Sequence, residues 1–258
     1  MNDEKGMGLI LYAKNAGYFL SIFLCSVYAQ CAILSVGVFD ESDKLPLAPW
    51  EVVQFSNKFP ATNYQIINLD GVNAVEAIAV GSMALLARPV EVDLQELPIL
   101  CWRWRIDSTI ESADIMSKAG DDYAARVYVS FKLPSKAISF GMRVKLGLAR
   151  KIYGNQVPDA AINYVWDNKH PVGTQVSNAY TNRTQMVVVQ SGDDNVNKWV
   201  EEQRDVLEDF NQIFGVEGAT LVQIAIASDT DNTGETARAG FADLHFVGHN
   251  QDCQFSPL

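Results

Sequence analysis

Apolar and polar residues alternate with a period of two in two runs of the chain, 99–106 and 123–131. This is the period of a β-strand, whose successive side chains point to opposite faces. The first run places tryptophans on its apolar face and arginines on its polar face: Trp102 and Trp104, then Arg103 and Arg105. The second run places Arg126 opposite an apolar face. We predict two strands with one face in the core and, if the strands are neighbours, a shared polar face carrying the three arginines.

Shorter strand-like runs occur at close spacing through the rest of the chain: 50–55, 64–69, 74–80, 83–90, 142–148, 162–166, 185–190, 221–228 and 240–247. Several joints between them carry turn residues, such as Asp70-Gly71 and Gly81-Ser82, which are typical of hairpins. The run 142–148 alternates only weakly and belongs to a segment with a basic patch: Arg143, Lys145, Arg150 and Lys151. Residues 107–120 show no strong period, so we expect a long loop there.

One segment has the apolar spacing of a helix, over residues 196–214. Asp193 or Asp194 is expected to cap its start, and Gly215 to end it. Many short strands with one late helix predict an all-β fold, a two-sheet antiparallel jelly-roll sandwich with a crossover helix. A doubly wound α/β fold would need helices throughout the chain.

The first thirty residues have the pattern of an export signal. Lys5 and Lys14 precede an apolar run, 16–27, and Val27-Tyr28-Ala29 matches a signal-peptidase site. We therefore predict a signal peptide over 1–29, one β-sandwich domain over 30–258, and export, with the periplasm as the expected location. An uncleaved anchor is the alternative, although the uninterrupted run is shorter than the ~20 residues that a membrane span needs.

The net charge and the cysteines indicate which partners and which disulfides to expect. The formal net charge is −11, which repels phosphate backbones, so nucleic acid is not an expected partner. Cys25 would leave with the signal peptide, and the cysteines that remain are Cys31, Cys101 and Cys253. In an oxidising compartment these allow one disulfide and one spare thiol, with the pairing open.

Two acidic segments lie at predicted strand ends. Asp121 and Asp122 precede the strand that carries Arg126, and such carboxylates can bind calcium, hold sugar hydroxyls or act as an acid and base pair. Asp229, Asp231 and Asn232 follow a buried strand in a D-x-D-x-T-G sequence that resembles the start of a calcium loop. The closing Glu of an EF-hand is missing, so Asp229 and Asp231 are candidate calcium ligands only outside that motif. Polar turns are the structural alternative for both segments.

Aromatic residues offer a third kind of contact. Trp166 lies near a predicted loop and is a candidate platform for stacking on a sugar, with a place in the core as the alternative. The three histidines are too scattered to predict a catalytic triad or a metal cluster. The sequence has no G-x-S-x-G motif, P-loop or dinucleotide fingerprint.

Several blocks together resemble an exported bacterial family known as domain of unknown function 3047. They are Trp102-Arg103-Trp104, residues 118–129, Asn163-Tyr164-Val165-Trp166, Trp199 with Glu202 and Arg204-Asp205-Val206, and residues 226–233. The resemblance covers about residues 39–247 and implies a jelly-roll sandwich, with no established activity. It adds weight to one shared site: Asp121, Asp122, Arg126, Asn163, Asp229, Asp231 and Asn232.

We therefore expect a jelly-roll protein that binds a glycan or similar polar ligand on a concave face lined by Arg and Asp. The predicted ligand-binding residues are Arg103, Arg105, Asp121, Asp122, Arg126, Asn163, Trp166, Asp229, Asp231 and Asn232. No cofactor other than calcium is expected. The alternatives are a polysaccharide-acting enzyme that uses paired Asp residues, and a structural or assembly protein of the cell envelope.

Overall fold

A computed structural model describes residues 33–257 except 41, 46 and 154–156, and the side chains of 152 and 153. The predicted signal peptide and Cys31 lie outside the described residues. The residues that form the fold belong to one compact unit, Cys31–Leu258. In the described part of the chain, no helix is long and apolar enough to cross a membrane.

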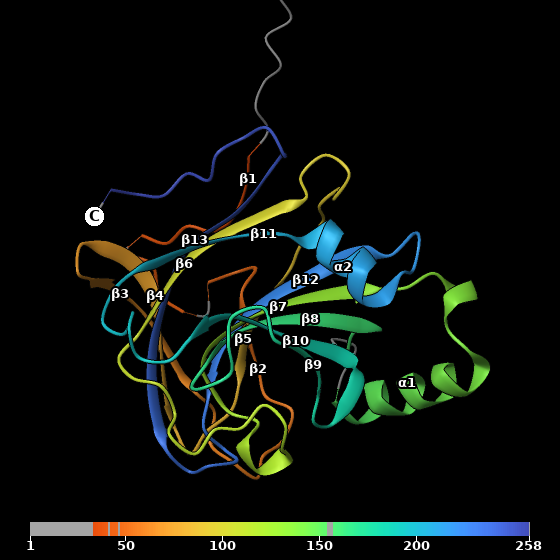
Figure 1. The fold of residues 1–258 in the computed structure, drawn as a ribbon, viewed down its shortest axis with the longest axis horizontal. Helices are drawn as coiled ribbons and strands as arrows, with labels where there is room; N and C mark the ends of the chain where they lie inside the picture. Colours follow the sequence, from red (N-terminus) through yellow and green to blue (C-terminus); the bar gives the residue numbers. More distant parts are fainter. Residues whose placement is uncertain (1–32, 41, 46, 154–156, 258) are drawn as a thin grey trace, which may run out of the picture. The chain divides into compact units, whose positions relative to one another are not determined.

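Two β-sheets pack face to face as a sandwich (Figure 1). Sheet A contains, in spatial order, β11 (Val200–Asp205), β6 (Ile99–Ile106), β13 (Thr236–Val247), β4 (Val72–Val80) and β3 (Asn63–Leu69), with β1 (Leu34–Gly37) paired to β13. Sheet B contains β2 (Glu51–Val53), β5 (Leu85–Pro89), β12 (Thr220–Asp229), β7 (Tyr123–Lys132), β8 (Ala160–Asp167), β10 (Thr181–Ser191) and β9 (Gln175–Asn178). Every pairing between the described strands is antiparallel except β8 with β10. The predicted jelly-roll sandwich is confirmed.

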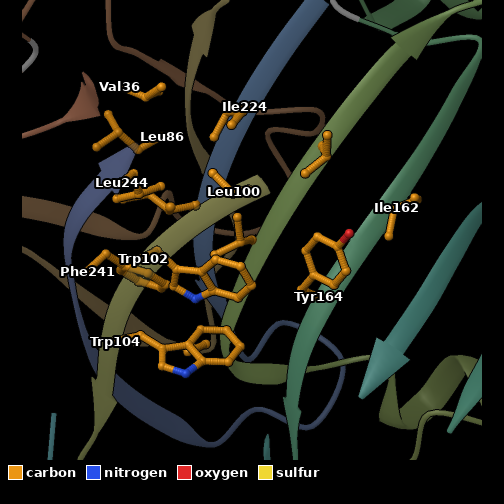
Figure 2. Packing of buried hydrophobic residues seen from close by; sticks show 14 of the residues in the cluster. Val36, Leu86, Leu100, Trp102, Trp104, Ile162, Tyr164, Ile224, Phe241 and Leu244 are labelled. Carbon is orange, nitrogen blue, oxygen red and sulfur yellow. The ribbon is translucent and has the colours of Figure 1, made fainter. Parts of the chain in front are cut away.

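The core lies between the sheets and is rich in aromatic rings (Figure 2). Trp102 and Trp104 of sheet A meet edge to face at 5.5 Å, and Trp102 stacks on Tyr164 of sheet B at 5.5 Å. Such pairs add about 0.5–1.5 kcal/mol to the stability that comes from area burial. The alternation along 99–106 therefore predicted the inner face of β6 correctly, because both tryptophans are fully buried.

The late helix is shorter than predicted. α2 spans Val206–Phe214, and Asp205 caps it by accepting a hydrogen bond from the Glu208 amide. Residues 200–205 instead form β11, which pairs with β6 along its whole length. This pairing covers an edge of β6 that would otherwise expose unpaired backbone groups. The contact with β6 therefore overrides the helical spacing in the first half of the predicted segment. The helix accordingly does not begin at either of the expected caps, Asp193 or Asp194.

A second helix occupies the segment where a strand was expected. α1 spans Phe140–Tyr153 and replaces the predicted strand over 142–148. Its apolar residues lie on two opposite faces of the helix, so their spacing along the chain resembles the weak alternation of a strand. The loop expected over 107–120 is confirmed, with the short 3-10 turn η1 (Lys118–Gly120) at its end; a second such turn, η2 (Ser135–Ala137), precedes α1.

The predicted shared arginine face does not form. β6 belongs to sheet A and β7 to sheet B, and the polar side of each strand is the outer side of its sheet. Arg103 and Arg105 are therefore separated from Arg126 by the whole sandwich core. Alternation identifies the outer face of a strand, but it does not say which strands are neighbours.

Arg103 and Arg105 are both held by neighbours on the outer face of sheet A. Arg103 is 1% exposed, pairs with Asp243 at 2.5 Å and donates a hydrogen bond to the Ser256 carbonyl. A disulfide between Cys101 and Cys253 ties the segment that carries Ser256 to β6. Arg105 pairs with two carboxylates and an amide, those of Asp70, Asp107 and Asn197. Both arginines thus have structural partners.

Candidate functional site

A buried ion pair lies on the outer face of sheet B, where β7 and β12 are neighbours. The Arg126 guanidinium contacts the Asp229 carboxylate at 2.6 Å, and both side chains are almost fully buried. The rings of Tyr123 and Tyr128 lie 5.2 and 5.1 Å from the guanidinium carbon, close enough for cation–π attraction. Burial raises the pKa of Asp229 well above its usual range, and the positive charge of Arg126 opposes this rise. Removing two charges from water costs free energy, and ionisable groups with perturbed pKa values cluster at functional sites. The buried pair therefore marks this position as a candidate functional site.

The two acidic segments predicted from the sequence come together beside this pair. Asp122 accepts hydrogen bonds from the backbone amides of Asn232 and Thr233 and from the Asn232 side chain. These bonds join the segment before β7 to the segment after β12. The antiparallel pairing of β7 with β12 brings both segments to the same end of the sheet.

Asp121 occupies a different position from Asp122. It accepts two hydrogen bonds from the Asn178 amide, at 3.0 and 2.9 Å, and one from the Tyr123 hydroxyl at 3.3 Å. Burial raises the pKa of Asp121, and burial followed by the nearby charge of Asp122 raises the pKa of Asp231. Protonated carboxyls are thus favoured here more than at an open surface.

A pocket of about 510 Å³ opens above the ion pair. Its polar lining includes Asp121, Arg126, Asn178, Asp229, Asp231 and Asn232. Its apolar and aromatic lining includes Phe55, Phe59, Met83, Tyr128, Pro158 and Tyr180. This volume lies in the range of ligand sites in proteins, and an apolar wall with a few convergent polar groups is their usual composition.

Two buried polar atoms of the ion pair have no hydrogen-bond partner within the described residues. They are Arg126 Nε and Asp229 Oδ1. Buried polar atoms are nearly always satisfied in folded proteins, and an exception calls for a role or a bound molecule. Arg126 and Asp229 both line the pocket, so these unsatisfied hydrogen-bonding atoms lie at the candidate site.

The carboxylates of Asp122, Asp229 and Asp231 are close enough to share a cation. One oxygen from each lies within 4.8 Å of the others. Calcium takes six to eight oxygen ligands, whereas Asp122 already accepts hydrogen bonds from residues 232 and 233, and Arg126 already neutralises Asp229. A cation at this position would therefore compete with Arg126, and of the two predicted calcium ligands only Asp231 has no positively charged partner among the described residues.

The predicted site residues divide into two groups. The pocket brings together Asp121, Arg126, Asp229, Asp231 and Asn232, with Asp122 holding the loops behind it. Four other residues lie elsewhere: Arg103, Arg105, Asn163 and Trp166.

Trp166 and Asn163 are both buried in the described structure. Trp166 is 2% exposed, packs on Trp104 and donates a hydrogen bond to the Gly192 carbonyl. Its ring belongs to the core, so the alternative to the stacking platform is the correct one. Asn163 is opposite Tyr128 in the pairing of β7 with β8, and its amide lies 3.7 Å from the Met186 sulfur. It lies behind the pocket wall and does not line the pocket.

Sequence reasoning missed the residues that form the rim. Phe59 and Tyr180 are 41% and 57% exposed, and the Tyr180 hydroxyl donates to the Asn232 amide oxygen at 2.9 Å. Asn178 ends β9, a strand that was not predicted. The signal that could have found them is the Asn178-Ala179-Tyr180 turn, which places an amide and an aromatic ring at one hairpin.

Comparisons with known proteins give a family and a set of distant structures. The family model "Protein of unknown function (DUF3047)" matches residues 48–245. No curated protein matches the chain. Among solved structures, a family 12 xyloglucanase from Bacillus licheniformis is 10% identical, with a TM-score of 0.44, over 84% of this chain and 100% of that one. Endoglucanase 3 from Trichoderma harzianum is 7% identical, with a TM-score of 0.37, over 77% of this chain and 97% of that one. Likeness at this level does not transfer an activity.

Proposed function

The chain belongs to the DUF3047 family, and we propose that it binds a glycan or a similar hydroxyl-rich ligand in the pocket above Arg126 and Asp229. The observation that carries the proposal is the composition of this pocket. Carboxylates, amides and a guanidinium meet aromatic rings within about 510 Å³.

Hydroxyl groups suit this mixed lining because each one both donates and accepts a hydrogen bond. Asp121 and Asp231 supply acceptors, and Asn178 and Asn232 supply amides. Sugar rings also present C–H faces, which pack against aromatic side chains such as Phe59 and Tyr180. A purely apolar ligand would leave the acidic groups desolvated and unpaired, at a cost in affinity.

The contacts of the carboxylates favour binding over glycoside hydrolysis, which needs two carboxyl groups that act on the substrate. Asp122 is occupied by backbone amides and Asp229 by Arg126. The raised pKa values of Asp121 and Asp231 leave these two as the pair that an enzyme would use.

A purely structural role would need the acidic and basic groups to neutralise each other with no opening above them. Arg103 and Arg105 fit that description on sheet A, but a pocket lies over Arg126. The proposal includes export to the periplasm. The disulfide Cys101–Cys253 supports this, since such bonds persist mainly in oxidising compartments.

The test is binding of neutral and acidic oligosaccharides to the chain from Gln30 onward, which contains the whole core. Melting temperature identifies a glycan class, and calorimetry gives its Kd. We expect Phe59→Ala and Tyr180→Ala to weaken binding by about tenfold or more, since each removes a packed aromatic face. Val172→Ala is the control, because Val172 is an apolar residue that is 62% exposed and lies outside the pocket. Absence of binding by any glycan, or unchanged affinity in both aromatic variants, would refute the proposal.

A further inference from the structure

The outer face of α1 carries an apolar ridge that no described residue covers. Phe140, Val144 and Leu148 are 80%, 57% and 60% exposed. They recur every four residues, so they lie in one row along the helix. Three neighbouring exposed apolar side chains on one helix are unusual for the free surface of a soluble domain.

The opposite face fixes the orientation of the helix. Leu146 is 3% exposed, and Arg150 pairs at 2.8 Å with Asp159, the residue before β8. At the other end, Arg143 donates hydrogen bonds to the carbonyls of Ser135 and Ile138. The ridge therefore points away from the sandwich, and α1 lies outside both sheets (Figure 1).

Positive charge surrounds the ridge. At 100° per residue, Arg143 falls on one side of the row, Lys145 on the other, and Lys151 within it. Residues 123–158 contain no Asp or Glu, although the whole chain has 31 acidic residues and a net charge of −11. Gly141 and Gly147, next to the row, have open space where a side chain would be. The outer face is thus apolar along its row, basic around it and without acidic side chains.

We propose that this face of α1 docks on an anionic lipid surface. A helix that lies in a membrane interface has an apolar row that enters the acyl boundary and Lys or Arg at its margins, which contact anionic headgroups. The charge pattern selects this partner, since an anionic lipid surface complements both the apolar row and its basic margins. The proposal is independent of what the pocket binds.

The experiment uses the chain from Gln30, which omits the apolar run 16–27. Co-sedimentation is measured with vesicles of phosphatidylglycerol mixed with phosphatidylcholine, and with vesicles of phosphatidylcholine alone. We expect binding only to the anionic vesicles, weakened by high salt. Phe140→Ser/Leu148→Ser and Lys145→Glu/Lys151→Glu should each reduce this binding by about tenfold or more.

Two matched control variants test whether the loss of vesicle binding is specific to α1 or follows from any change of an exposed side chain. Val172→Ser alters an equally exposed apolar residue elsewhere, and Lys198→Glu reverses an exposed charge outside α1; both should bind as the wild type does. Circular dichroism checks that each variant folds. The proposal is overturned if the wild type does not bind anionic vesicles or if the α1 variants bind them normally. It is also overturned if size-exclusion chromatography shows that the wild type self-associates and that the ridge variants abolish this self-association instead.

Discussion

Arg126 contacts Asp229 at 2.6 Å on two neighbouring strands of sheet B, with the rings of Tyr123 and Tyr128 5.2 and 5.1 Å from the guanidinium carbon. Asp229 ends β12, and Arg126 lies inside β7. The pair therefore links the floor of the pocket to the centre of the sheet, so that stability and ligand binding depend on the same two side chains.

Breaking this pair on one side should be strongly destabilising. Arg126→Met or Asp229→Asn leaves an unpaired buried group and should lower the free energy of unfolding by about 3–5 kcal/mol. The double variant Arg126→Met/Asp229→Leu should lose clearly less than the sum of the single losses. Urea unfolding measures all three, with Lys169→Met as the control, because the exposed pair of Lys169 with Asp114 should contribute under about 1 kcal/mol. Additive losses would contradict this account.

Glu202 should make stability depend on pH. Burial raises its pKa from 4.5 to about 7, although Gln190 and Trp104 donate hydrogen bonds to its carboxylate. The folded chain thus holds a proton between these two pH values that the unfolded chain has lost. Stability from this group is complete below pH 4.5 and is lost as pH rises through about 7.

The comparison variant for this effect is Glu202→Gln. From pH 5 to pH 8 the wild type should lose up to about 3 kcal/mol more than the variant, at about 1.4 kcal/mol per pKa unit. Urea unfolding across that range gives the difference. Parallel pH profiles in the two proteins would show that Glu202 titrates normally.

Asp122 should stabilise the loop that follows β12. Asp122→Ala removes the acceptor of the Asn232 and Thr233 amides and should cost about 1–3 kcal/mol of stability. Hydrogen exchange should accelerate at these two amides in particular. Asp194→Ala, a change at an exposed aspartate, is the matched control and should leave both measurements unchanged.

The disulfide should stabilise the outer face of sheet A. Cys101→Ser/Cys253→Ser should lower the free energy of unfolding by about 2–5 kcal/mol, because the bond closes a segment of 152 residues. A reducing agent should lower the melting temperature of the wild type to that of this variant. If the agent also destabilised the variant, its effect would come from another source.

Local patterns predicted some parts of this fold well. The alternation along 99–106 identified the buried side of β6, and turn residues at Asp70-Gly71 separated β3 from β4. Strand partners were not predictable, since period two is the same in any sheet. Arg103 was therefore grouped wrongly with Arg126.

The two helices show the same limit. Residues 200–205 carry a helical spacing, but pairing with β6 makes them a strand. α1 carries apolar residues on its buried and its exposed side, so its hydrophobic spacing does not indicate a single core-facing stripe.

The candidate site was partly predictable for a physical reason. Polar residues at the ends of buried strands identified Asp121, Asp229 and Asp231, and antiparallel pairing brings such ends together. The rim was not predictable, because Phe59 and Tyr180 lie in segments without periodic structure. Their position depends on how the loops fold over the sheet; the Asn178-Ala179-Tyr180 turn indicates a hairpin at Tyr180 but not where that hairpin lies.

The link between Cys101 and Cys253 also sets an order of events during synthesis. The ribosome adds the two cysteines 152 residues apart, so the thiol of Cys101 has no partner until every described strand of both sheets has been made. During that interval Arg103 lacks the Ser256 carbonyl and the Asp243 carboxylate that later enclose it. Until then the chain carries a free thiol at Cys101 and a cation at Arg103 without its partners, and both are enclosed once the segment after β13 is in place.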